Sequence, residues 1–262
     1  MIYQDIIKAA HLGGEFIKKY FFQSLEIQEK SIAADFRTQA DLESEQAILE
    51  YLQKIYPLAN YICEETDSID NNSEHTFIID PLDGTNSFNL GIAHFSVSIA
   101  LLKKSVPMFG VVYNPISSTT IHAHHSHGTF LNNQKAQVSS TMTLGKSTIG
   151  YSCGYINDRS FFYRLQTNLE QRNIKRLLVN WSPAMDLALL AAGKIDAIIY
   201  NGCEIYDHAA GKILVQEAGG KVTDFQGQID TDIYNPFFVA SNGTTIHDEI
   251  IEILQTSIMH HT

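Results

Sequence analysis

The protein has 262 residues, 44% of them hydrophobic and 18% charged, which supports a sizeable apolar core and excludes a disordered chain. The net charge of −11 at pH 7 argues against a nucleic-acid-binding protein, because such proteins carry a basic patch. A small phosphorylated ligand stays compatible with this charge if metal ions reverse its sign locally.

The cysteines and the N-terminus indicate a cytoplasmic setting. Cys63, Cys153 and Cys203 are too few and too scattered for a disulfide framework, so we expect reduced thiols. The first residues mix charged side chains into an apolar pattern, unlike a signal peptide. No uncharged run approaches the ~20 residues of a membrane span. We therefore expect a soluble cytoplasmic protein with no membrane partner.

The first half of the chain predicts two helices followed by consecutive strands. Apolar spacing predicts amphipathic helices over residues 3–21 and 42–56, the second with Asp41 at an N-cap-like position. A hairpin that turns at Gly128 is predicted over residues 117–133. Short apolar runs predict the strands between them, at residues 61–63, 77–79, 95–103 and 108–113.

From about residue 145 strands and helices alternate, which is typical of an α/β layer. The predicted strands lie at residues 147–151, 176–179, 195–200, 222 and 238–240. The predicted helices lie at residues 159–171, 183–192, 207–218 and 245–255. We accordingly divide the chain into an N-terminal α+β half, residues 1–143, and a C-terminal α/β half, residues 144–262.

The segment FIIDPLDGTNSF, residues 77–88, carries the first chemical signal. A strand that ends at Asp80 places a carboxylate at the rim of a sheet, where α/β sites commonly lie. Asp83 follows three residues later, so a turn can bring both carboxylates together. Clustered carboxylates repel one another, and hard oxygen ligands of this kind suit Mg²⁺. The pattern therefore favours a divalent cation site.

Gly84 and Thr85 extend this interpretation. Gly84 permits a close approach of the backbone, and the amides of Gly84 and Thr85 would form an anion site if Thr85 opens a helix. A metal site beside an anion site predicts phosphate-ester hydrolysis. The alternative is an ordinary turn, since Asp, Pro and Gly are all turn residues.

The whole string resembles the metal-binding motif of the inositol monophosphatase family, two apolar residues followed by Asp-Pro-Ile/Leu-Asp-Gly-Thr. Three further segments are similar to family motifs. Residues 63–65, Cys-Glu-Glu, resemble Gly-Glu-Glu, and residues 35–41 resemble Asp-x-x-Thr-x-x-Asp. Residues 206–225 resemble the second family signature, with Tyr206 in place of the usual Trp. Four motifs in order make the resemblance specific.

The resemblance implies an α+β fold with layered α-β-α-β-α sugar-phosphatase architecture and a reaction that uses two or three Mg²⁺ ions. The implied metal ligands are Glu64, Asp80, the Leu82 carbonyl, Asp83 and Asp207. Asp41 and Thr85 would orient and deprotonate the attacking water, and Glu64 would hold a third ion. The implied substrate contacts are Asp83, Gly84, Thr85, Ser182 and Tyr200.

The resemblance implies a small phosphorylated substrate, and inositol 1-phosphate is the first prediction. Tyr200 stands where the family has an inositol-contacting glutamate, with Glu204 nearby, and Trp181 replaces a glycine beside Ser182. Trp181 would narrow a polyol pocket, stack on a base, or pack on the surface. The alternatives are a 3′(2′),5′-bisphosphate nucleotidase, a fructose-1,6-bisphosphatase and a histidinol-phosphatase of the same superfamily.

The resemblance also implies inhibition by Li⁺ and a homodimer. A non-enzymatic alternative is a regulatory protein that kept the fold and binds RNA polymerase or another partner. The intact set Asp41, Glu64, Asp80, Asp83, Thr85 and Asp207 argues against lost chemistry.

The segment IHAHHSHGTF carries four histidines, His122, His124, His125 and His127. Alternation along a strand would place several of them on one face, so a transition-metal site is one interpretation. The preferred interpretation is that these histidines lie on the surface of the predicted hairpin. For His208, next to Asp207, we expect a side chain that faces solvent or substrate.

Overall fold

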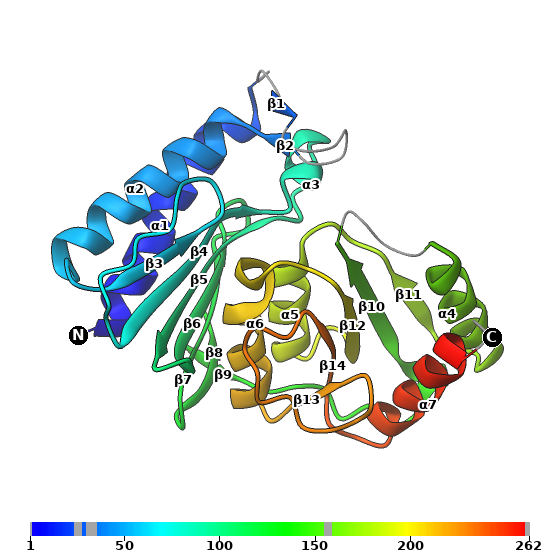
Figure 1. Ribbon diagram of the computed structural model, residues 1–262. Coiled ribbons are helices and arrows are strands. Elements are labelled where there is room, and N and C mark those ends of the chain that lie inside the picture. Colours follow the sequence, from blue (N-terminus) through cyan, green and yellow to red (C-terminus); the bar gives the residue numbers. More distant parts are fainter. Residues whose placement is uncertain (1, 24–27, 30–35, 155–158, 260–262) are drawn as a thin grey trace.

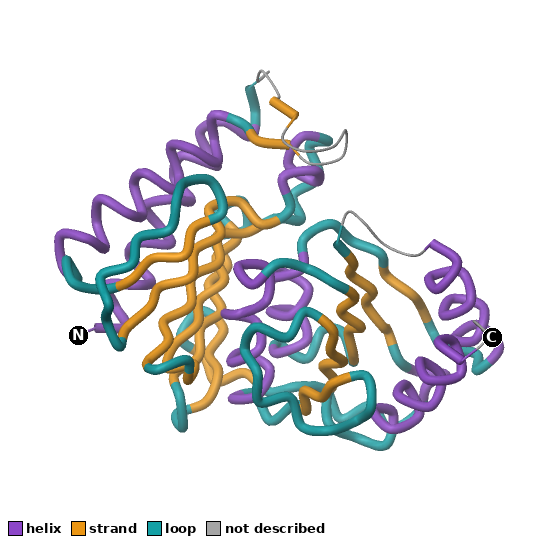
Figure 2. Tube along the Cα trace, in the orientation of Figure 1, coloured by secondary structure: helices purple, strands orange, loops and turns teal. Residues whose placement is uncertain are grey.

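A computed structural model describes residues 2–23, 28–29, 36–154 and 159–259. Helices and sheets alternate in five layers, helix, sheet, helix, sheet, helix (Figure 1). Figure 2 shows the same layers by secondary structure, with two groups of strands separated by a pair of helices. The predicted α-β-α-β-α layering is confirmed.

The first sheet has seven strands in the order β3-β4-β5-β6-β7-β8-β9, and only its β3–β4 pair is parallel. Its strands are β3 (Asn60–Cys63), β4 (His75–Asp83), β5 (Ser96–Lys103), β6 (Val106–Asn114), β7 (Thr119–His124), β8 (Gly128–Leu131) and β9 (Gln134–Ala136). Helices α1 (Ile2–Phe21) and α2 (Gln39–Ile55) cover its outer face (Figure 1). The short helix α3 (Thr85–Asn89) follows β4, and β1 (Gln28–Glu29) pairs with β2 (Phe36–Arg37).

The second sheet has five strands in the order β11-β10-β12-β14-β13. Its strands are β10 (Thr148–Cys153), β11 (Arg176–Leu178), β12 (Ala197–Asn201), β13 (Lys221–Asp224) and β14 (Phe237–Ser241). Helices α5 (Pro183–Ala191) and α6 (Ile205–Glu217) lie between the two sheets, and α4 (Arg159–Gln171) and α7 (Ile246–Met259) cover the far side (Figure 1). The 3₁₀ turn η1 (Leu144–Lys146) precedes β10.

The middle layer explains why several segments are apolar on all sides. Ala100 on β5 and Ile198 on β12 both pack in the core that surrounds α5 and α6. The neighbouring Ile99 instead packs beneath α1 and α2, and Ile199 packs beneath α4 and α7. Because these strands are buried on both faces, their sequences read as continuous apolar runs rather than alternating ones.

Most predicted elements are confirmed, and the differences lie in bounds and in short strands. The β4 strand continues through Asp83 instead of ending near Asp80, α2 and α6 begin three and two residues earlier than predicted, and α7 ends four residues later. The short strands β1, β2 and β9 were not predicted. Asp41 is not the N-cap of α2, because Thr38 is the N-cap and Asp41 is the third helical residue. The strands of the two sheets come from residues 60–136 and 148–241, yet α5 and α6 pack against both sheets. The boundary at residue 143 therefore stays a prediction.

Two smaller observations concern the rest of the chain. No helix within the described ranges has both the length and the apolar character that crossing a membrane requires. All three cysteines are free thiols.

Acid is expected to destabilise the second sheet through His247. This side chain is buried, with Nε2 3.0 Å from Thr223 Oγ1 and Nδ1 2.7 Å from Ser241 Oγ. Burial lowers its pKa from the ordinary 6.5 to about 4. Its contribution to stability is complete above pH 6.5 and is lost as the pH falls toward 4, because the unfolded chain binds the proton first.

We expect this group to lower the free energy of unfolding by about 2 kcal/mol between pH 7 and pH 5. Urea unfolding at both pH values measures the loss for the protein and for His247→Gln. The fall in unfolding free energy between pH 7 and pH 5 should be about 2 kcal/mol smaller for His247→Gln than for the unsubstituted protein. An identical loss in both proteins would show that His247 does not titrate as described.

Candidate active site

An irregularity in β4 brings Asp80 and Asp83 to one face of the first sheet. Residues three apart in a regular strand point to opposite faces. Here Asp80 pairs with Ser98 and Asp83 with Ser96, so three steps along β4 match two along β5. Both carboxylates therefore share a face with these serines. Both aspartates are buried, and Asp80 Oδ1 accepts a hydrogen bond from the Leu82 amide at 3.0 Å.

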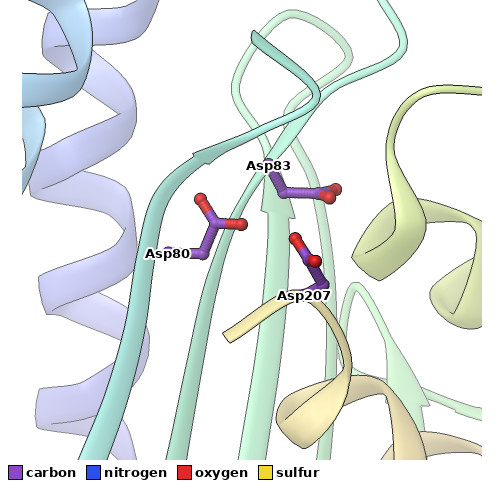
Figure 3. A group of neighbouring side chains, drawn as sticks. All are labelled: Asp80, Asp83 and Asp207. Carbon is purple, nitrogen blue, oxygen red and sulfur yellow. The ribbon is translucent and has the colours of Figure 1, made fainter. Parts of the chain in front are cut away.

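Asp207 joins them from the middle helix layer. It is the third residue of α6, and its Oδ2 accepts a hydrogen bond from the N-cap amide of Glu204 at 2.8 Å. One oxygen each of Asp80, Asp83 and Asp207 lie within 4.8 Å of one another, and Figure 3 shows the three carboxylates pointing toward a common space. The structure thus brings together the three aspartates predicted from two separate motifs.

Glu64 belongs to the same cluster. The parallel pairing of β3 and β4 sets Cys63 opposite Ile79, so the next residues, Glu64 and Asp80, lie side by side at the strand ends. Burial raises the pKa of Asp80 well above its ordinary value, and the charges of Glu64, Asp83 and Asp207 raise it further. Mutual repulsion of this kind is relieved by a cation.

The donor set therefore fits Mg²⁺, which prefers carboxylate and carbonyl oxygens. Burial also raises the pKa of Asp207, again with contributions from neighbouring carboxylates, and raises that of Asp83 to about 6. Within the described part of the chain, three or more His, Cys, Asp or Glu side chains come this close only at the aspartate triad.

Asp83 accepts hydrogen bonds from the first sheet and from the middle helix layer. Ser96 Oγ on β5 donates to its carboxylate at 2.9 Å. The other donors come from the start of α5: the Ser182 hydroxyl and the amides of Ala184 and Met185, the two amides at 3.1 Å. These hydrogen bonds favour the ionised form and oppose the effect of burial on the pKa of Asp83.

Asp41 and Thr85 meet beside this cluster. Asp41 Oδ2 accepts hydrogen bonds from the Thr38 amide at 2.8 Å and the Thr38 hydroxyl at 2.6 Å, which closes the capping box of α2. Its Oδ1 faces the Thr85 hydroxyl at 3.2 Å. The same hydroxyl lies 3.1 Å from the Leu82 carbonyl. A buried carboxylate is thus paired with a hydroxyl next to the candidate metal ligands.

Gly84 is required by both conformation and space. Its φ is +91°, and a Cβ atom there would lie 2.8 Å from Ser182 Cβ and 2.9 Å from the Trp181 carbonyl. We expect Gly84→Ala to cost about 2–4 kcal/mol of unfolding free energy, from backbone strain plus overpacking. Gly91 is the matched control, because its φ is +72° and no atom lies within 4 Å of an added Cβ.

Urea denaturation of both variants separates the two effects. Gly91→Ala should cost about 1 kcal/mol, the strain alone. Equal losses in both variants would mean that the contact with the 181–182 segment contributes nothing.

The residues predicted to contact or lie near the substrate differ in their exposure to solvent. Ser182 is buried and donates to Asp83, and Tyr200 is fully buried with its hydroxyl 3.4 Å from the Asp207 carbonyl. Tyr200 therefore contacts the backbone of Asp207 through its hydroxyl, and its side chain is not exposed to a substrate in this structure. Trp181 is 57% exposed next to Gly84, and Glu204 is the exposed N-cap of α6.

One expectation about histidines is wrong, and a second holds in part. His208 does not face solvent or substrate, because it is buried with Nε2 3.0 Å from the Ile233 carbonyl. Of the four clustered histidines, His125 and His127 are exposed as expected, whereas His122 and His124 of β7 are half-buried. His122 stacks between Phe109 and Phe130, and His124 lies edge-on to Tyr3 of α1.

Sequence reasoning missed the residues that support the ligands. Thr38 caps α2 around Asp41, Ser96 holds Asp83, and Ser44 Oγ donates to the Pro81 carbonyl at 3.0 Å. Thr38 alone had a sequence signal, because a threonine three residues before a carboxylate is typical of a capping box.

The five-layer fold and its carboxylate cluster agree with the class of phosphatase that the sequence motifs predict. Comparisons with known proteins agree with this class. The sequence model of the inositol monophosphatase family matches residues 2–259. The fructose-1,6-bisphosphatase/inositol-1-monophosphatase of Thermotoga maritima is 30% identical, over 95% of this chain and 93% of that protein. The Nus factor SuhB of Pasteurella multocida is 34% identical, over 84% of each chain.

Solved structures give the same result. The extragenic suppressor protein SuhB of Bartonella henselae superposes with a TM-score of 0.91 at 30% identity, covering 97% of this chain and 98% of that one. The protein belongs to the inositol monophosphatase family, and the resemblance stated from its motifs is confirmed.

Proposed function

We propose that the protein is a Mg²⁺-dependent phosphomonoesterase that hydrolyses a small phosphorylated polyol, with inositol 1-phosphate as the first candidate. The phosphatase class follows from the family. The observation that carries the proposal is the carboxylate triad of buried Asp80 and Asp83 and half-buried Asp207 next to the Asp41–Thr85 pair.

Glu64, Asp80, Asp83, Asp207 and the Leu82 carbonyl would hold two or three Mg²⁺ ions. Bound there, the ions would lower the pKa of a water molecule and offset charge on the phosphoryl oxygens. The cations would also allow a chain with a net charge of −11 to accept an anionic substrate.

Thr85 and Asp41 would orient the attacking water and take up its proton. Thr85 Oγ1 would accept a hydrogen bond from the water, and the proton would pass to Asp41 Oδ1, 3.2 Å away. The Thr38 hydrogen bonds to Asp41 Oδ2 keep the other oxygen turned toward Thr85. We propose that Gly84 and Thr85 contact the phosphate through their amides.

Two other functions have support from the relatives. The name of the Thermotoga maritima protein favours a sugar bisphosphate as a second substrate class. Several relatives are named Nus factor SuhB, which favours a regulatory role through a macromolecular partner such as RNA polymerase as a second function.

Phosphate release with Mg²⁺ tests the proposal. The substrates are inositol 1-phosphate, fructose 1,6-bisphosphate, adenosine 3′,5′-bisphosphate and histidinol phosphate, each with and without Li⁺, with Asp80→Asn as the inactive control. We expect one dominant, Li⁺-sensitive substrate whose hydrolysis the variant does not support. No release from any of the four by folded, Mg²⁺-bound protein would reject the catalytic proposal for these compounds. The homodimer stays a prediction of the resemblance, and the cytoplasmic location stays a prediction from the cysteines and the N-terminus.

A further inference from the structure

Helix α2 turns three buried polar side chains toward the site. Asp41, Ser44 and Glu45 are spaced i, i+3 and i+4, so they share one face of the helix, and none of them is exposed. The opposite face carries exposed or half-exposed polar residues such as Gln46 and Glu50. Polar groups that are fully buried need a partner to offset the loss of water.

Each of the three contacts a different ligand-bearing segment. Asp41 faces the Thr85 hydroxyl at the start of α3, and the Ser44 hydroxyl donates to the Pro81 carbonyl of β4 at 3.0 Å. Glu45 Oε2 accepts the backbone amide of Glu65 at 2.9 Å, on the segment that follows β3. One rigid helix thus fixes all three segments relative to one another.

The contact of Glu45 with the Glu65 amide is not explained by packing of the core. A buried carboxylate is expensive to desolvate, and its Oε1 has no hydrogen-bond partner among the described residues. An apolar residue would fill the same space at less expense. The amide it binds belongs to the residue after Glu64, whose carboxylate lies beside Asp80.

We propose that Glu45 is a positioning residue for the metal site, because it fixes the Glu64–Glu65 backbone so that the Glu64 carboxylate faces Asp80. This inference rests on the proposed function, since it presupposes that Glu64 and Asp80 hold a divalent cation. The charge of Glu45 also reaches the end of β3, where it adds to the effect of burial in raising the pKa of the Cys63 thiol. Geometry and charge must therefore be tested separately.

Two conservative variants separate them. Glu45→Gln removes the charge and keeps an oxygen acceptor at the same reach. Glu45→Asp keeps the charge and draws the acceptor back by one methylene. Glu50→Asp is the matched control, because Glu50 is an exposed carboxylate on the same helix. Mn²⁺ serves as the probe, and the free-ion signal in electron paramagnetic resonance gives the dissociation constant without any substrate.

If Glu45 acts through the hydrogen bond, Glu45→Asp should weaken Mn²⁺ binding about 10–100-fold, while Glu45→Gln stays within about threefold of the unsubstituted protein. Glu50→Asp should bind as the unsubstituted protein does. Where the protein releases phosphate, Glu45→Asp should need more Mg²⁺ but reach a similar kcat at saturation. A merely structural defect would lower kcat as well.

Other patterns overturn the inference. Unchanged binding in Glu45→Asp, weakened binding in Glu45→Gln equal to that in Glu45→Asp, or no Mn²⁺ binding by the unsubstituted protein would each reject a positioning role. The proposed function is judged independently, by phosphate release from the unsubstituted protein. If that protein binds Mn²⁺ and hydrolyses nothing, the catalytic proposal fails while the comparison of the two Glu45 variants still stands.

Discussion

Asp80→Asn is expected to abolish phosphate release and, in the absence of metal, to make the protein more stable. Asn keeps the Oδ1 acceptor for the Leu82 amide and removes one charge from a buried cluster of carboxylates. Loss of one ligand should lower kcat about 10³-fold, which corresponds to several kcal/mol of lost transition-state stabilisation. Relief of repulsion should raise the unfolding free energy of the metal-free protein by about 1–3 kcal/mol.

Thermal unfolding with and without Mg²⁺ measures the second effect. The unsubstituted protein should gain stability from Mg²⁺ by mass action, and the variant should gain little. Asp83→Asn is the informative comparison. Its new amide would face four donors that now serve Asp83, from Ser96, Ser182 and two backbone amides, so this variant should be less stable. A metal-free Asp80→Asn protein that is less stable than the unsubstituted one would contradict the repulsion described for the cluster.

Thr85→Val is expected to lower kcat by about 10²–10⁴-fold, the usual contribution of a positioned proton acceptor. Valine has the shape of threonine and lacks the hydroxyl that lies 3.2 Å from Asp41 Oδ1. Because Thr85 supplies no carboxylate to the cluster, Mn²⁺ binding should be unchanged. Steady-state kinetics at saturating Mg²⁺ give the effect on turnover alone.

Thr85→Ser is the control for the hydroxyl. It restores the oxygen, and we expect most of the activity to return. An active Thr85→Val protein would show that the Asp41–Thr85 pair does not handle the proton. An inactive Thr85→Ser protein would indicate that the methyl group, buried with the rest of the side chain, matters more than the hydroxyl.

The individual helices and the Asp80–Asp83 pair were predictable because they depend on local pattern, whereas the order of the five layers followed from the family resemblance. Apolar spacing marks helices such as α4 (Arg159–Gln171), whose bounds agree with the prediction at both ends. The local motif predicted Asp80 and Asp83 as metal ligands, and the resemblance added Glu64 and Asp207 to the predicted ligand set. Asp80, Asp83 and Asp207 then converge as expected.

The remaining features depend on contacts between distant segments. The shift in register between β4 and β5 decides that Asp80 and Asp83 share a face, and no periodicity in β4 shows it. Counting back from Asp207 predicts a substrate contact at Tyr200, but Tyr200 lies fully buried on β12 of the second sheet. Glu45 reads as an ordinary helix residue until its partner, 20 positions later, is known.

The attachment of Asp83 also bears on how the protein is made. Asp80 and Asp83 leave the ribosome long before the hydroxyl and amides of residues 182–185 that hold Asp83, and Asp207 emerges later still. Until then the carboxylates of the first sheet lack these partners, and its inner face lacks α5 and α6. Nascent chains that pause before residue 207 should therefore hold an open, acidic and apolar surface, the kind of intermediate that chaperones bind.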